Sequence, residues 1–223
     1  MKTYVIVVAG GSGERMKSDI PKQFIEVAGK SVLMHTIERF RLFDNNIEII
    51  VVLPESLMGY WDELREKYAF PVPHKTAAGG PTRFHSVKKG LELISETGLV
   101  AVHDGVRPLV SIDTIARCFK TAAGRGNAIP VVSPPDSLRM ISGDGNKPLD
   151  RTGIKLVQTP QVFCTDLIKK AFLQDYRPEF TDDATVLEMM KIRINLVEGN
   201  RENIKITTPE DLIIAESLIK DIA

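Results

Sequence analysis

A run of glycines followed by basic residues is the first part of the chain whose composition indicates chemistry. The apolar segment that ends at Val8 is followed by AGGSGERM, residues 9–16, and then by PKQF, residues 21–24. Glycines leave backbone N–H groups accessible to a polyphosphate, and Arg15 and Lys22 bring two positive charges to the same region. The pattern predicts a phosphate-binding loop.

Two widespread phosphate loops fit this segment poorly. No glycine in it is followed by Lys and then Ser or Thr, so the P-loop of ATPases is excluded. In the dinucleotide-binding fingerprint, Gly11 and Gly13 would take the first two positions, but Met16 occupies the third, where close helix packing needs a small residue. An NAD(P)-dependent oxidoreductase therefore remains only as a weaker alternative.

A second group of polar residues, in VHDGVRP, follows an apolar run at residues 99–104. Open α/β sheets bind their ligands at the carboxyl ends of the strands, so Asp104 is expected at a ligand site. The four histidines show no metal-binding spacing such as H-E-x-x-H. We therefore expect no metal site built by protein side chains alone.

The elements that must position these residues alternate along the chain. Short β-branched runs predict strands at 4–8, 47–53, 99–104, 128–132 and 192–197, most of them almost continuously apolar, as strands covered on both faces are. Helical spacing of apolar residues occurs between them, at Leu33, Ile37 and Phe40, at Val87, Leu91 and Ile94, and at Ile112, Ile115 and Phe119. The sequence predicts an α/β fold with a mostly parallel, twisted, Rossmann-like sheet and helices on both faces.

The chain length fits a single domain over residues 1–223. TTPEDLIIAESLI predicts a final helix with Thr208 as N-cap, Pro209 in the first helical position and Asp211 closing a capping box. Residues 134–160 are rich in Pro, Gly and charge and lack a helical period. The SGDGN turn within them predicts a β-hairpin arm that projects from the domain.

The overall composition excludes several classes of partner. Lys and Arg together number 29, as do Asp and Glu, so the chain lacks the basic excess of a general nucleic-acid or membrane-surface binder. Cys118 and Cys164 form no C-x-x-C pair, which favours a reducing compartment. No apolar run has the length of a membrane span, and the first residues do not resemble a signal peptide. We expect a cytoplasmic protein without nucleic-acid or membrane partners.

Seven motifs in a fixed order carry a resemblance to a known family. AGGSGERM, PKQF, GGPTRFHSV, VHDGVRP, DRTGIKLVQTPQVF, TDDA and NIKITTPEDL together resemble the 2-C-methyl-D-erythritol 4-phosphate cytidylyltransferases, over about residues 5–215. Ribitol 5-phosphate cytidylyltransferases are similar over much of the chain, although the DRT ahead of QTPQ favours the methylerythritol branch. A nucleotide-binding protein without catalysis is a further alternative, which the presence of every expected cation disfavours.

The resemblance implies a reaction and a set of roles. A phosphate oxygen of the polyol phosphate attacks the α-phosphorus of CTP and expels pyrophosphate, with Mg²⁺ held mainly by phosphates and water. Arg15 and Lys22 match the residues that stabilise the transition state, and Arg151 and Lys205 those that position the acceptor. The implied nucleotide-binding residues are Ala9, Gly10, Gly11, Ser12, Gly13, Gly79, Gly80, Arg83, Ser86 and Asp104. The implied acceptor-binding residues are Asp104, Arg107, Ser137, Arg151, Thr159, Thr181 and Lys205.

The chain departs from the family pattern at two positions. Pro81 stands where the family commonly has Asp, and Ser137 where it often has Thr, so that the hydroxyl is kept and the methyl group lost. The resemblance also gives the arm a purpose, because in the family it is exchanged between two subunits. We therefore expect a homodimer in which the arm carries Ser137 and Arg151 into the active site of the partner.

Overall fold

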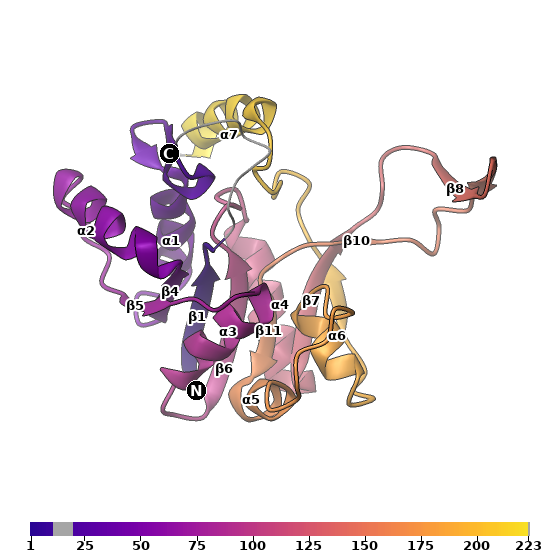
Figure 1. Ribbon diagram of the computed structural model, residues 1–223, viewed down its shortest axis with the longest axis horizontal. Helices are drawn as coiled ribbons and strands as arrows, with labels where there is room; N and C mark the ends of the chain where they lie inside the picture. The colour runs from indigo at the N-terminus through magenta and orange to yellow at the C-terminus, as the bar shows by residue number, and fades with distance from the viewer. Residues whose placement is uncertain (11–19, 223) are drawn as a thin grey trace.

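Eight strands form the central sheet of the computed structural model, which describes residues 1–10 and 20–222 (Figure 1). They are β1 (Lys2–Val8), β4 (Glu48–Leu53), β5 (Lys75–Ala78), β6 (Gly98–Asp104), β7 (Asn127–Val132), β10 (Leu156–Val157), β11 (Gln161–Cys164) and β12 (Leu196–Glu198). Their order is β10-β7-β11-β6-β1-β4-β5, and β12 also pairs with β7. The pairs that β1 forms with β4 and β6 are parallel, whereas β11 runs antiparallel between β6 and β7.

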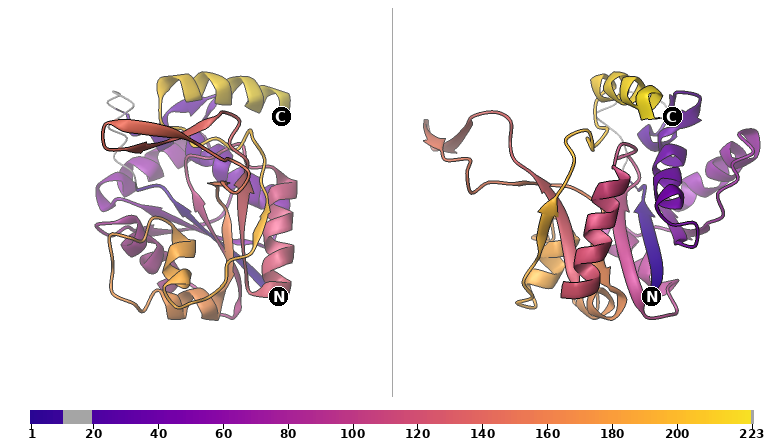
Figure 2. Two further views of the ribbon diagram at one scale, coloured as in Figure 1. Left: turned by 90° about the vertical axis from the view of Figure 1, so that its right-hand side faces the viewer. Right: turned by 180° about the vertical axis from the view of Figure 1, so that it is seen from behind.

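Helices cover both faces of this sheet, as the sequence predicted (Figure 2). The α-helices are α1 (Val32–Phe43), α2 (Met58–Lys67), α3 (Arg83–Glu92), α4 (Ile112–Arg125), α5 (Thr165–Ala171), α6 (Asp183–Glu188) and α7 (Pro209–Ile222). Shorter elements are the 3-10 helices η2 (Lys22–Phe24) and η3 (Glu55–Leu57) and the paired strands β2 (Glu26–Val27) and β3 (Lys30–Ser31). No helix in the described ranges combines the length and apolar character that a membrane crossing requires.

The side-chain alternation of β1 divides the core into two layers. Val5 and Val7 face the layer that α1, α2 and α4 complete, whereas Tyr4 and Ile6 face the layer completed by α3, α5 and α6. Successive strand residues point to opposite faces, so a strand that is apolar throughout needs helices on both sides. This is why the continuous apolar runs of the sequence correctly predicted a doubly covered sheet.

The predicted start of the last helix at Pro209 and the predicted hairpin turn are confirmed. The backbone N–H groups of Thr207 and Thr208 both donate to the Asp211 carboxylate at 2.8 Å, and α7 begins at Pro209. The strands β8 (Leu138–Ser142) and β9 (Gly145–Leu149) pair through a two-residue turn in which Gly143 has a φ of +56°. Figure 1 shows this hairpin standing away from the sheet at the end of an extended segment.

Two boundaries differ from the sequence predictions. The projecting segment ends before residue 160, because Leu156 and Val157 already pair with β7 as β10. The strand predicted at 192–197 begins only at Leu196. Before that point the side chain of Asn127 takes the place of a backbone ladder, donating to the Arg193 carbonyl at 3.0 Å and accepting from the Asn195 N–H at 2.9 Å.

Two helical glycines should respond to substitution in opposite ways. A Cβ at Gly90 in α3 would lie 2.7 Å from Cγ2 of the buried Ile6, whereas a Cβ at Gly124 in α4 would meet nothing within 4 Å. We expect Gly90→Ala to destabilise the fold by about 1–3 kcal/mol through overpacking. Gly124→Ala should stabilise it by up to about 1 kcal/mol through helix propensity. Urea unfolding measures both, and equal effects would contradict the close packing of α3 on β1.

Candidate active site

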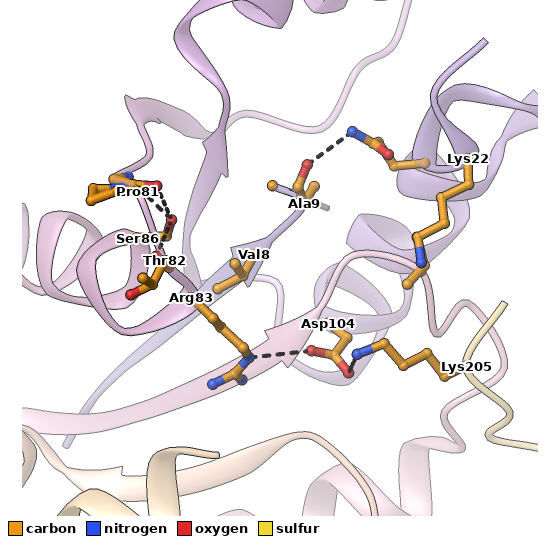
Figure 3. A pocket seen from close by; sticks show the side chains of 13 residues that line it. Val8, Ala9, Lys22, Pro81, Thr82, Arg83, Ser86, Asp104 and Lys205 are labelled. Atoms are coloured by element: carbon orange, nitrogen blue, oxygen red, sulfur yellow. Dashed lines mark hydrogen bonds and ion pairs between the residues drawn. The ribbon is translucent and has the colours of Figure 1, made fainter. Parts of the chain in front are cut away.

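A pocket of about 230 Å³ opens at the carboxyl ends of β1 and β6 (Figure 3). One wall comes from the end of β1 and from η2, the other from the segment that leads into α3, and the floor holds Asp104 and Lys205. The residues that line it are Val8, Ala9, Gly10, Lys22, Gln23, Gly80, Pro81, Thr82, Arg83, Ser86, Asp104, Val106 and Lys205. Eight of them were predicted as site residues, namely Ala9, Gly10, Lys22, Gly80, Arg83, Ser86, Asp104 and Lys205.

The first wall is fixed by a glutamine of the PKQF segment. The side chain of Gln23 is buried, and its Nε2 donates to the Ala9 carbonyl at 2.9 Å. The Ala9 N–H in turn donates to the Val52 carbonyl at 2.9 Å, which continues the ladder from β1 to β4. Lys22 is thus held beside the end of β1 by its neighbour in sequence. The predicted Gly11, Ser12, Gly13 and Arg15 lie outside the described residues.

The opposite wall is built from residues that cannot be larger. A Cβ at Gly79 would lie 2.9 Å from the Ser86 Oγ, and one at Gly80 would lie 2.3 Å from the His85 Cβ. Ser86 Oγ accepts from the Gly80 N–H at 3.1 Å and donates to the Thr82 carbonyl at 3.0 Å. The hydroxyl proton of Ser86 is therefore already engaged in a hydrogen bond within the protein. Only the remaining lone pair of Oγ is available to a ligand.

Asp104 is the centre of the charged floor. Its carboxylate contacts Arg83 Nε at 3.6 Å, Arg107 Nε at 3.1 Å and Lys205 Nζ at 3.1 Å. Figure 3 shows Arg83 and Lys205 reaching it from opposite sides. Burial alone would raise the pKa of Asp104, but the three cations hold it well below its ordinary value. Asp104 is therefore ionised, and in turn it holds three positive charges at the floor.

Behind Asp104 lies a buried polar network whose hydrogen-bond directions can be assigned. His103 Nε2 lies 3.1 Å from the Arg107 carbonyl, which can only accept, so Nε2 carries the proton of the neutral ring. Nδ1 therefore accepts from Thr159 Oγ1 at 3.0 Å, and Thr159 Oγ1 in turn accepts from the Asp104 N–H at 3.1 Å. Burial lowers the pKa of His103 to about 4, which keeps the ring neutral. Thr159, predicted as an acceptor ligand, is thus occupied in supporting the floor.

A second recess, of about 390 Å³, adjoins the first and shares Lys205 with it. Arg107 and Arg201 add two further cations, and no carboxylate is among the lining residues described for it. Arg107 is oriented by a bond from its NH1 to the Asn203 carbonyl at 2.8 Å. Lys205 therefore stands between two cavities, either of which can admit an anion.

Three predicted acceptor-binding residues lie apart from both recesses. Ser137 and Arg151 are exposed on the projecting arm, where Arg151 donates to the Pro135 carbonyl. Thr181 is exposed just ahead of α6, and its N–H donates to the Glu179 carbonyl at 2.9 Å. Within one chain these residues are not brought to the pocket.

Sequence reasoning missed four residues that organise the site, namely Gln23, His103, Asn203 and Asp183. Gln23 and Asn203 stand inside motifs that were recognised, and the Asn203 side chain donates from Nδ2 to the Thr159 carbonyl at 2.8 Å. No spacing rule distinguishes such a bracing amide from a ligand-binding one. Asp183 pairs with Arg83 from 100 positions away. Among the described residues, no three His, Cys, Asp or Glu side chains gather closely enough to hold a metal ion by themselves.

Comparisons with known proteins agree on one family. The family model described as IspD, 2-C-methyl-D-erythritol 4-phosphate cytidylyltransferase, matches residues 3–221. A protein of that name from Bacteroides thetaiotaomicron is 53% identical over 98% of this chain and 100% of its own length. One from Porphyromonas gingivalis is 48% identical over 98% of both chains.

Solved structures show the same likeness in three dimensions. The 2-C-methyl-D-erythritol 4-phosphate cytidylyltransferase of Thermus thermophilus has a TM-score of 0.79 at 32% identity, covering 99% of this chain and 100% of that one. The 4-diphosphocytidyl-2C-methyl-D-erythritol synthase of Anaerococcus prevotii has a TM-score of 0.82 at 28% identity, covering 98% and 96%. With the family model matching nearly the whole chain, this protein belongs to the 2-C-methyl-D-erythritol 4-phosphate cytidylyltransferase family.

Proposed function

We propose that this chain transfers the cytidylyl group of CTP to 2-C-methyl-D-erythritol 4-phosphate, giving 4-diphosphocytidyl-2-C-methyl-D-erythritol and pyrophosphate. The observation that carries the proposal is one pocket in which a wall of glycines meets a floor of cations held by Asp104. Family membership supports the same reaction. It also favours methylerythritol phosphate over ribitol phosphate as acceptor, and a transferase over an NAD(P)-dependent oxidoreductase or a binding protein.

The glycine wall suits the base of the nucleotide. Gly80 lines the pocket beside Ser86, and the lack of side chains at Gly79 and Gly80 lets Ser86 and His85 pack closely against this wall. One lone pair of Ser86 Oγ remains available to a ligand. A cytosine presents an amino group that such an acceptor can bind. Pro81, exposed at the rim, has neither the carboxylate of the common family residue nor an N–H to offer. We therefore assign selectivity for the base to the wall behind Pro81.

The cations suit the transfer itself. An oxygen of the acceptor phosphate forms a bond to the α-phosphorus of CTP, and the bond from that phosphorus to the bridging oxygen of the β-phosphate breaks, so that pyrophosphate leaves with its electron pair. Both reactants are anions, and the positive charges must offset their repulsion and the charge of the transition state. Lys22 lines the pocket together with the end of β1. Arg15 lies outside the described residues, and its role in stabilising the transition state stays a prediction from the family resemblance.

Lys205 stands at the boundary of the two recesses, so one ammonium group can contact both reactants. Holding an acceptor in line with the reacting phosphorus lowers the barrier without any chemical step by the side chain. The second recess, with Arg107 and Arg201, is the place that we assign to the phosphate of the acceptor. Its lack of carboxylates suits a dianion.

Mg²⁺ fits the donor set of this pocket. The pocket offers one carboxylate, that of Asp104, and Mg²⁺ is commonly held by one or two carboxylates together with substrate phosphates and water. When bound, the ion would neutralise charge on the phosphates. Because three cations already contact Asp104, we assign most of the metal's ligands to the triphosphate and to water.

We further propose that the arm completes the site of a second copy of the chain. The β8–β9 hairpin leaves Ile141 73% exposed and Met140 43% exposed, and an isolated two-stranded hairpin is marginally stable in water. A partner surface would bury these side chains. Exchange of the arm would also bring Arg151 and Ser137, which lie apart from the pocket of their own chain, to a pocket that lacks them.

A cytoplasmic location remains our expectation from the two unpaired cysteines.

The acceptor is tested by supplying CTP and Mg²⁺ with each polyol phosphate in turn. We expect pyrophosphate release with 2-C-methyl-D-erythritol 4-phosphate and little with ribitol 5-phosphate, because the family match favours the branched acceptor. NADH should neither bind nor change the rate. A higher kcat/KM for ribitol 5-phosphate would refute the assigned substrate.

Lys22→Ala should keep the fold and lose about a hundred- to a thousandfold in kcat, as removal of one preorganised donor to a transition state typically does. Lys120→Ala, which removes an exposed lysine of α4, is the matched control and should change kcat by less than about twofold. Pyrophosphate release and thermal unfolding are measured on both. Near-normal turnover of Lys22→Ala would remove Lys22 from the mechanism.

Composite sites can be tested by mixing two inactive variants. Arg151→Ala damages the arm and Lys22→Ala the body, so a mixed dimer would contain one intact site. Refolding the two together should restore about a quarter of the wild-type activity, since half of the dimers are mixed and half of their sites are complete. Lys22→Ala mixed with Lys205→Ala should restore none, because both residues line the same pocket. A fully active monomer by light scattering would contradict the exchanged arm.

A further inference from the structure

A buried acid that the proposed reaction does not use lies behind the pocket. Asp183 is the first residue of α6, and its side chain is 1% exposed. Its two oxygens accept from Arg83 NH1 at 2.8 Å and Arg83 NH2 at 2.7 Å, which is the bidentate geometry of a strong ion pair. Burying a carboxylate is costly unless it is paired, so its presence calls for a physical explanation.

The pair fixes the direction of the Arg83 head group. With both terminal nitrogens bound to Asp183, the remaining Nε faces Asp104 Oδ1 at 3.6 Å. Burial opposes the charge of Arg83, but the carboxylates of Asp183 and Asp104 raise its pKa above the ordinary value. Arg83 therefore stays charged and spans two acids, one outside the pocket and one on its floor.

Asp183 is itself anchored to the sheet. Gln161 in β11 donates from Nε2 to the Asp182 carboxylate at 2.8 Å and accepts at Oε1 from the Ala184 N–H at 2.9 Å. A capping box between Asp182 and Thr185 closes the first turn of α6. The start of α6 is held on both sides of Asp183, which fixes the backbone that carries this carboxylate.

The pair between Arg83 and Asp183 affects how three cations divide between the two carboxylate oxygens of Asp104. Oδ2 of Asp104 takes both Arg107 Nε and Lys205 Nζ at 3.1 Å, while Arg83 stays at the longer distance from Oδ1. Without Asp183, Asp104 would be the nearest carboxylate left to Arg83. The guanidinium would then compete with Lys205 and Arg107 for it and change the positions of these two of the three cations that line the second recess.

We propose that Asp183 is a positioning residue of this transferase: it holds Arg83 back from Asp104 so that Lys205 and Arg107 keep the geometry needed for the acceptor. The inference rests on the proposed function. It assigns Asp183 no contact with either substrate. Because the cations that it keeps in place line the acceptor recess, its effect should be larger on the kinetic parameters of the acceptor than on those of CTP, and it should require Arg83.

Steady-state kinetics of Asp183→Asn test this. We expect kcat/KM for the polyol phosphate to fall at least about tenfold, since small displacements of positioning groups cost that much. The KM for CTP should change less, because Lys205 and Arg107 line the recess assigned to the acceptor, although Arg83 lines the nucleotide pocket. Asp166→Asn is the matched control, because it removes an exposed acid from the first turn of α5 and should leave both parameters within about twofold. Thermal unfolding reports any loss of stability separately.

A double-mutant cycle shows whether Asp183 acts through Arg83. A lysine at position 83 can contact one carboxylate but not both, so Arg83→Lys should reproduce the acceptor defect, and the double variant should be no worse than the poorer single one. Additive losses, or an Asp183→Asn enzyme with normal acceptor kinetics, would overturn the proposal. If Asp183→Asn does not fold, normal acceptor kinetics of Arg83→Lys would overturn it. Wild-type enzyme inactive with CTP and both acceptors would instead count against the proposed function.

Discussion

The site depends on a buried carboxylate surrounded by three cations. Asp104 ends β6, and the groups that neutralise it come from α3, from the turn that follows β6, and from the segment ahead of α7. An unpaired charge at this depth would be expensive, so the folded chain must bring all three regions to one strand end. The same contacts that neutralise Asp104 gather positive charge where a phosphate ester would have to bind. Stability and ligand binding thus share one set of side chains.

Much of the fold could be predicted because the relevant signals are local. A strand that is apolar at every position needs cover on both faces, and helices with one apolar stripe supply it. The two layers meeting on β1 follow from that rule. The start of α7 at Pro209 and the hairpin turn at Gly143 follow from local capping and turn residues. The antiparallel insertion of β11 between β6 and β7 could not be predicted, because its four residues carry no mark of strand direction.

The outline of the candidate site could be predicted because the residues concerned stand in short local motifs. Lys22, Ser86, Asp104 and Lys205 were identified from motifs, and they do meet in one pocket. What the sequence does not encode locally is which groups brace the walls and the floor of this pocket. Gln23 braces Ala9, Asn203 orients Arg107 and Asp183 fixes Arg83 through contacts that span 14, 96 and 100 positions. Partnerships of this range depend on the completed topology, and a short motif cannot report them.

The neutral imidazole of His103 sets a lower limit on the pH at which this part of the sheet keeps its full stability. Its Nδ1 must accept the proton of Thr159, which it can do only while unprotonated. In the fold the ring stays neutral down to about pH 4, whereas an unfolded histidine takes up a proton near its ordinary pKa of 6.5. Acid therefore favours the unfolded chain progressively between these two values, and the contribution of His103 to stability is complete only above them. The acid tolerance of the protein is thus set partly inside its core, at the strand end that also supports Asp104.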